Sequence, residues 1–131
     1  IDKMSKNFEN LILYHNNKCS KSREVKKYLD SNDINYELID YLNKPIDKKL
    51  LNKVLLNLKN DFKEIIRTNE KIFKNLDKNE KLLKHENILN LISKYPKLMQ
   101  RPVIAKQENQ QITAALICRP PELVNNFLDE N

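Results

Sequence analysis

The N-terminal part of the chain alternates between apolar segments and a helical pattern. Residues 11–14 form an uninterrupted apolar run, which predicts a short buried strand. Residues 20–31 have helical spacing, and residues 34–41 partly alternate between apolar and polar side chains, which predicts a second strand. The inner face of the predicted helix consists of Val25, Tyr28 and Leu29. This order predicts a βαβ unit with parallel strands and a right-handed crossover.

The middle of the chain is predicted to be helical. Asp47 is a candidate N-cap for a helix over residues 48–59, where leucine and valine recur with helical periodicity. A short helix is predicted over residues 61–67 and a longer one over residues 86–95, separated by a loop or one more short helix. Residues 45–97 are therefore predicted to form a helical insertion between strands.

The C-terminal part of the chain returns to strands. Residues 102–105 and 112–117 are largely apolar and flank a predicted hairpin turn at residues 108–109. A proline, Pro120 or Pro121, then opens a last helix over residues 122–128.

The complete order, β-α-β … β-β-α, predicts an α/β fold with a mixed sheet and a helical insertion. We predict one domain over residues 1–131, with a core formed by residues 11–42 and 100–129. A chain of 131 residues with 40% hydrophobic and 32% charged content can bury one such core. Because the chain has no glycine, we expect asparagine or aspartate at left-handed backbone positions. The candidates lie in predicted turns: Asn32, which would cap the first helix, Asn43 and Asn109.

Charge and cysteine content limit the classes of function that the sequence supports. The net charge is +6, but the lysines alternate with acidic residues and no aromatic-and-basic platform for nucleic-acid bases is present, so we expect no nucleic-acid binding. No apolar run is long enough for a membrane span, and residues 1–10 lack the apolar core of a signal peptide. Cys19 and Cys118 are far apart in the sequence and form no disulfide framework, so we expect a cytoplasmic protein.

Cys19 is the main candidate for chemistry. It lies just before the first predicted helix, where the helix dipole and unpaired backbone N–H groups favour an anion. Lys18, Lys21 and Arg23 are close in sequence and also favour the thiolate, which is the reactive form. The alternative is a small core cysteine, against which these polar and cationic flanks argue.

Three further residues bear on the predicted role of Cys19 as a nucleophile. Ser22 takes the place of the second thiol of a C-x-x-C motif, so any adduct on Cys19 needs an external thiol to resolve it. His15 either helps to ionise Cys19 or is a turn residue satisfied by the backbone. Cys118 is predicted to be a half-buried cysteine without a catalytic role. Two histidines and two cysteines without metal-ligand spacing argue against a metal site.

The arginines stand out in a chain that otherwise uses lysine. Only four of the 24 basic residues are arginine. Arginine offers a planar fork of donors that binds oxyanions bidentately, which lysine cannot do. Arg67, Arg101 and Arg119 are therefore candidate oxyanion ligands, with ordinary surface ion pairs as the alternative.

Four motifs form an ordered set along the chain. They are Y-H-N-N-K-C-S-K-S-R at 14–23, I-I-R at 65–67, Y-P-K-L-M-Q-R-P-V at 95–103 and C-R-P-P-E at 118–122. In their order and spacing they resemble the glutaredoxin-linked, ArsC-type arsenate reductase family. The resemblance extends over about residues 11–128, nearly the whole chain, and implies a thioredoxin-like fold with a helical insertion.

The resemblance also implies a role for each matching residue. Cys19 is the nucleophile that attacks arsenate or a similar oxyanion. Three arginines bind that oxyanion: Arg67, Arg101 and Arg119. The supporting residues are His15, which favours the thiolate, Pro102, which follows a cis peptide bond, Ser22 and Arg23.

Glutathione is the co-substrate that this resemblance implies, and glutaredoxin is the partner that clears the mixed disulfide. We expect a monomer with no metal and no tightly bound cofactor. Two alternatives stay open. One is a transcriptional regulator of the Spx type that binds RNA polymerase, although Ser22 removes the C-x-x-C switch expected of that type. The other is a general glutathione-dependent thiol-exchange protein.

Overall fold

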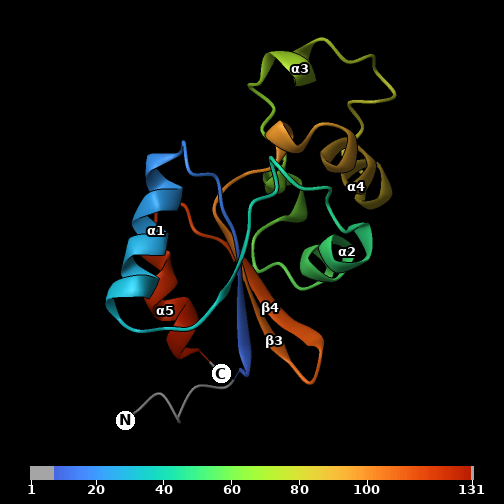
Figure 1. Ribbon diagram of the computed structural model, residues 1–131. Coiled ribbons are helices and arrows are strands. Elements are labelled where there is room, and N and C mark those ends of the chain that lie inside the picture. The colour runs from blue at the N-terminus through green and yellow to red at the C-terminus, as the bar shows by residue number, and fades with distance from the viewer. Residues whose placement is uncertain (1–7, 131) are drawn as a thin grey trace.

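The computed structural model describes residues 8–130 and contains a four-stranded mixed sheet with helices on both faces (Figure 1). The strand order is β2-β1-β3-β4. Strand β1 (Asn10–Tyr14) pairs in parallel with β2 (Glu37–Ile39) and antiparallel with β3 (Val103–Glu108). Strand β3 continues through a hairpin into β4 (Gln111–Ile117). The mixed α/β fold predicted from the sequence is confirmed.

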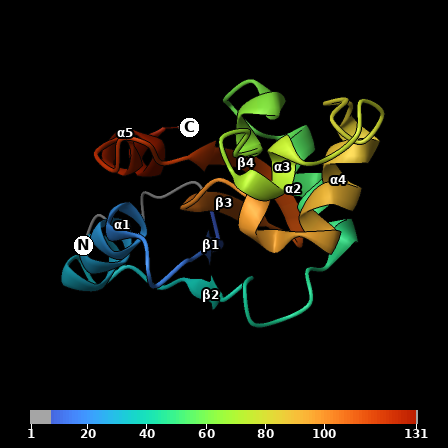
Figure 2. The same cartoon turned by 90° about the horizontal axis from the view of Figure 1, so that it is seen from above.

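Two helix layers cover the sheet because the side chains of a strand alternate between its faces. Leu11 and Leu13 of β1 belong to a core shared with α1 (Ser20–Ser31) and α5 (Leu123–Asp129), whereas Ile12 and Tyr14 belong to the opposite core. Figure 2 shows α1 and α5 on one side of the molecule and the helices of the central segment on the other.

The helical insertion forms that second layer. It comprises five short helices: α2 (Lys48–Leu56), the 3₁₀ helix η2 (Phe62–Ile65), α3 (Lys71–Lys74), α4 (His85–Lys94) and the 3₁₀ helix η3 (Pro96–Leu98). As predicted, Asp47 caps α2 by accepting hydrogen bonds from the backbone N–H groups of Lys49 and Leu50.

Main-chain hydrogen bonds join the start and the end of this insertion. The N–H of Arg67 donates to the carbonyl of Leu98 over 2.8 Å, and the N–H of Gln100 donates to the carbonyl of Ile65 over 2.7 Å. Ile66 and Met99 form an antiparallel bridge between these two bonds. The segment that carries Arg67 is thereby held beside the segment that leads into Arg101.

Several predicted boundaries were wrong. The second strand is only three residues long, because β2 is an edge strand in which only Glu37, Leu38 and Ile39 pair with β1. Helix α2 ends at Leu56 and not at residue 59, and the helix predicted over residues 61–67 is the shorter η2.

The left-handed cap was also misplaced by one residue. Asn32 has a φ of −101°, and Asp33, with a φ of 54°, takes the left-handed conformation after α1. Asn43 does not have a positive φ either. Asn109, as predicted, does, together with Gln110 in the hairpin, so polar residues replace glycine at these positions.

Within residues 8–130, no helix has the length and apolar character of a membrane span. The sequence predicts that residues 1–10 are not a signal peptide. Of these, residues 1–7 lie outside the described part of the chain.

Candidate active site

Cys19 is the N-cap residue of α1, as the sequence predicted. Its backbone is extended, with a φ of −96°, and its carbonyl accepts the first helical hydrogen bond from Arg23. The N–H of Cys19 donates to the carbonyl of Asn16, which closes the turn between β1 and the helix. The side chain is partly exposed, so a small reactant can reach the sulfur.

The surroundings of Cys19 favour its thiolate. Partial burial raises the pKa, but backbone N–H groups of Ser22 and Lys21, together with a hydrogen bond and the charge of Arg101, lower the pKa of Cys19 to about 7. The neutral thiol makes no capping hydrogen bond, so these N–H groups are available to the charged sulfur. About half of the molecules therefore carry the thiolate at neutral pH.

Two arginines lie beside the sulfur. Nη1 of Arg119 is 3.9 Å from Cys19 Sγ and also donates to the carbonyl of Arg101 over 3.0 Å. Nε of Arg101 is buried and has no hydrogen-bond partner among residues 8–130. A buried guanidinium nitrogen without a partner is costly unless an acceptor arrives. This end of the site is therefore suited to an anion that reacts at Cys19.

Arg67 comes from the insertion and is held by two side chains. Its Nε donates to Glu70 over 3.1 Å and its Nη1 donates to Oε1 of Gln100 over 2.9 Å. The side chains of Arg67 and Glu70 are both about one-fifth exposed, so the pair is partly shielded from water. Arg67 is thus less free to bind an oxyanion than Arg101, because two of its N–H groups already have acceptors.

His15 does not contact the sulfur directly in the part of the chain that the structure describes. Its Nδ1 lies 2.7 Å from the hydroxyl of Ser22, and its Nε2 lies 3.4 Å from Oδ1 of Asn17. Burial lowers the pKa of His15, so the ring is neutral at neutral pH. His15 therefore acts on Cys19 only through the turn that it helps to hold.

Ser22 and Arg23 hold the same turn. The buried Ser22 hydroxyl accepts a 3.0 Å hydrogen bond from the N–H of Asn16, and Nη1 of the exposed Arg23 donates to the carbonyl of Asn17. Both contacts join the first turn of α1 to the loop that precedes Cys19. The side chains of Ser22 and Arg23 hold the turn, while the backbone N–H of Ser22 faces the sulfur.

Pro102 and Tyr41 are both buried. The Arg101–Pro102 peptide bond is cis, as the resemblance implied, and so is the Arg119–Pro120 bond, which the sequence did not indicate. The Tyr41 hydroxyl is the second buried side-chain atom without a hydrogen-bond partner in residues 8–130, and burial raises the pKa of Tyr41 to about 12. The charges of Arg101 and of the Cys19 thiolate also influence the pKa of Tyr41, the first lowering it and the second raising it.

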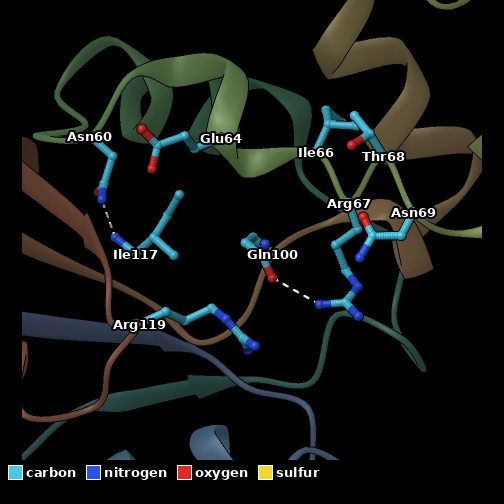
Figure 3. Close-up of a pocket in the computed structure, with 9 residues that line it drawn as sticks. All are labelled: Asn60, Glu64, Ile66, Arg67, Thr68, Asn69, Gln100, Ile117 and Arg119. Atoms are coloured by element: carbon cyan, nitrogen blue, oxygen red, sulfur yellow. Dashed lines mark hydrogen bonds between the residues drawn. The ribbon is translucent and has the colours of Figure 1, made fainter.

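A cavity of about 310 Å³ adjoins this group of residues (Figure 3). In Figure 3 the side chains of Arg67 and Arg119 point toward each other below Gln100, while Glu64 lies at the far end with Asn60. The cavity is lined by Asn60, Glu64, Ile66, Arg67, Thr68, Asn69, Gln100, Ile117 and Arg119. Arg67 and Arg119 therefore both face the cavity, and Arg119 also reaches Cys19.

The sequence did not single out four residues that contribute to this region, which are Tyr41, Glu64, Glu70 and Gln100. Glu70 had a signal, because it follows Arg67 at a spacing of three residues, at which side chains on a turn meet. Gln100, Tyr41 and Glu64 had none, since their importance depends on contacts between distant segments. Residues 8–130 contain no group of three or more histidine, cysteine or acidic side chains that could hold a metal ion.

The fold and the site define a thioredoxin-like thiol protein, in which a cysteine at a helix start is flanked by arginines. The chain belongs to the ArsC family, whose profile matches residues 14–127. The resemblance carried by the four sequence motifs is thus confirmed.

The names of individual relatives differ in the function that they state. YfgD of Escherichia coli (strain K12), an uncharacterized protein, is 35% identical over 113 residues, which cover 86% of this chain and 91% of YfgD. The structure of the arsenate reductase from Vibrio cholerae has a TM-score of 0.76 and 31% identity, and the match covers 93% of this chain and 100% of that one. The global transcriptional regulator Spx of Streptococcus mutans is 30% identical over 102 residues, which cover 78% of this chain and 74% of Spx.

Proposed function

We propose that this protein is an oxidoreductase that reduces arsenate to arsenite with glutathione and glutaredoxin. The observation that carries the proposal is the pairing of a partly exposed thiol of pKa about 7 with two arginines, one of which has a buried N–H group without an acceptor. This combination suits a nucleophile and an oxyanion in one site. The similarity to a solved arsenate reductase supports the same reaction.

The first step forms a sulfur–arsenic bond. The Cys19 thiolate attacks the As(V) centre of arsenate, and one arsenate oxygen leaves as water after protonation. Arg101 and Arg119 hold the remaining oxygens and offset the charge that develops on them. Arg67 contributes positive charge from the insertion while Glu70 and Gln100 hold it in place.

The second step transfers two electrons. A glutathione thiolate attacks the sulfur of Cys19, a disulfide forms between the two sulfurs, and the electron pair of the sulfur–arsenic bond stays on arsenic. Arsenic is thereby reduced from As(V) to As(III) and leaves as arsenite, while the two thiols are oxidised. The serine at position 22 supplies no second thiol, so glutaredoxin, acting on the mixed disulfide, regenerates Cys19. We propose that the protein acts as a monomer in the cytoplasm, where such thiols are kept reduced.

The reaction is tested by arsenate-dependent NADPH oxidation in the presence of glutathione, glutaredoxin and glutathione reductase. The wild-type protein should support steady turnover, and omission of arsenate, glutathione or glutaredoxin should each abolish it. An undiminished rate with Cys19→Ser would refute the proposal. A rate that needs a glutathionylated substrate but no arsenate would favour general thiol exchange instead.

A transcriptional regulator is the second candidate, favoured by the 30% identity to Spx of Streptococcus mutans. A regulator of this type is expected to bind RNA polymerase. Serine at position 22 counts against it, because a C-x-x-C switch cannot form. Co-purification of RNA polymerase with the tagged protein, together with no arsenate-dependent NADPH oxidation, would establish this candidate in place of the reductase.

A further inference from the structure

The cavity beside Cys19 has opposite charges at its two ends. Arg67 and Arg119 supply positive charge at one end, and Glu64 supplies negative charge at the other (Figure 3). Its volume of about 310 Å³ lies at the lower end of the range of ligand pockets, roughly 300–1,000 Å³. The cavity is therefore suited to one small molecule that carries both an anionic and a cationic group.

Glu64 differs from its neighbour Glu70 in having no partner. The Glu70 carboxylate is paired with Arg67. The Glu64 carboxylate makes no hydrogen bond or ion pair with any side chain or backbone group of residues 8–130. Asn60, at the same end, is already engaged, because its Oδ1 accepts a hydrogen bond from the N–H of Ile117. Glu64 is thus the acceptor at this end that remains available to a ligand.

The arginine end of the cavity adjoins the reactive sulfur. Nη1 of Arg119 is 3.9 Å from Cys19 Sγ, while the Arg119 side chain also lines the cavity. A ligand group that is bound at Arg119 therefore lies close to the sulfur of Cys19. A thiol held at Arg119 is therefore positioned next to whatever is bound to Cys19.

We propose that this cavity binds the thiol co-substrate, a small thiol of the glutathione class, and that Glu64 recognises its ammonium group. In this arrangement a carboxylate of the co-substrate lies at Arg67, its ammonium group lies at Glu64, and its sulfur lies beside Arg119 and Cys19. The inference rests on the proposed function for the role of the thiol. The charge pattern of the cavity supports it independently of arsenate.

Binding is tested without any reaction by titrating S-methylglutathione, which cannot form a disulfide, into the wild-type protein and into Glu64→Gln by calorimetry. We expect the variant to bind about tenfold more weakly, because an amide cannot replace a carboxylate facing an ammonium group. Glu64→Asp should recover part of the affinity. Glu86→Gln, which removes an exposed carboxylate from α4 outside the cavity, is the matched control and should bind like the wild type.

The pairing is tested by removing the ligand's ammonium group as well. S-methylglutathione without its α-amino group should lose about tenfold in affinity for the wild type and should bind Glu64→Gln no more weakly than the intact analogue does. In turnover assays, Glu64→Gln should raise KM for glutathione about tenfold and leave kcat and KM for arsenate within about twofold.

The outcomes separate this inference from the proposed function. Arsenate reduction with equal affinities of the wild type and Glu64→Gln would overturn the cavity assignment and leave the reductase intact. Binding that depends on Glu64 without any arsenate reduction would support the cavity as a thiol site and overturn the reductase. No binding of S-methylglutathione to the wild type at millimolar concentrations would also overturn the assignment.

Discussion

Cys19 begins helix α1 and is partly exposed, whereas Cys118 follows β4 and is fully buried. Burial raises the pKa of Cys118 to about 12, while the pKa of Cys19 is lowered to about 7, since hydrogen bonds from the start of α1 and from Arg101 outweigh the burial of Cys19. Arg119 is adjacent in sequence to Cys118, yet its guanidinium reaches Cys19. The comparison shows that the fold, and not sequence proximity, decides which thiol receives the positive charge.

Alkylation should reveal the largest difference between the two cysteines. From their pKa values, the thiolate fraction at pH 7 is roughly 10⁴ to 10⁵ times higher for Cys19 than for Cys118. We expect iodoacetamide to modify Cys19 alone in the folded protein, with a rate that rises with pH and is half-maximal near pH 7. Peptide mass spectrometry after timed labelling checks this. Equal labelling of both cysteines would contradict the predicted difference in their pKa values.

Replacing each sulfur should separate their roles. We expect Cys19→Ser to lower arsenate reduction by at least about a thousandfold, because an alcohol cannot supply the thiolate nucleophile. The coupled NADPH assay measures the rate, and circular dichroism confirms that the variant is folded. Residual activity above a tenth of the wild-type rate would move the chemistry away from Cys19.

Arg101 is the residue whose replacement should make Cys19 more like Cys118. Arg101→Lys keeps the positive charge but loses the planar fork and the hydrogen bond that lower the pKa of Cys19. We expect the alkylation midpoint to move above pH 7 and kcat/KM for arsenate to fall about 10- to 100-fold. If both quantities stay at their wild-type values, the bidentate argument for Arg101 is wrong.

Replacing the Ser22 side chain should have a smaller effect, because the hydroxyl holds the turn and does not contact the sulfur. Ser22→Ala removes the acceptor of the Asn16 N–H and the partner of His15 Nδ1. We expect a loss of about 1–3 kcal/mol in the free energy of unfolding and a three- to tenfold loss of activity. Urea denaturation and the coupled assay measure the two effects. Ser31→Ala, at the exposed end of α1, is the control and should change neither.

The smallest effect on activity is expected at Cys118. Cys118→Ala should leave arsenate reduction within about twofold of the wild type, since this thiol stays neutral in the core beside α5. The cavity left by the sulfur should cost about 1 kcal/mol in the free energy of unfolding. A tenfold loss of activity, with the protein still folded, would show that Cys118 takes part in the reaction.

Local patterns were sufficient to predict the parts of the site that lie within one turn of chain. The apolar run that forms β1 and the helical spacing that forms α1 placed Cys19 at a helix start, and Asp47 was correctly predicted to cap α2. These features depend on residues within about four positions of each other. An edge strand such as β2 depends on its partner for its length, so its ends could not be read from its own pattern.

The contacts across the site could not be predicted, because they depend on how distant segments meet. The 3.9 Å approach of Arg119 to Cys19 joins residues 100 positions apart, and the bond between Arg67 and Gln100 spans 33 positions. The rarity of arginine singled out Arg67, Arg101 and Arg119, but it did not reveal that Glu70 already holds Arg67. Glu64 belongs to none of the sequence motifs, and it becomes a candidate ligand-binding residue only because it lines the cavity.

The bridge of main-chain hydrogen bonds between residues 65–67 and 98–100 has a consequence for how this site can evolve. Peptide groups carry the same donor and acceptor whatever the side chain, proline excepted. These main-chain hydrogen bonds set the spacing between Arg67 and Arg101. Most substitutions at residues 65–67 and 98–100 should therefore leave that spacing unchanged. Side chains that face the cavity, such as Thr68 and Asn69, are free to vary without moving the arginines. Substitutions in the cavity can therefore change which co-substrate binds, while Arg67 and Arg101 keep their positions.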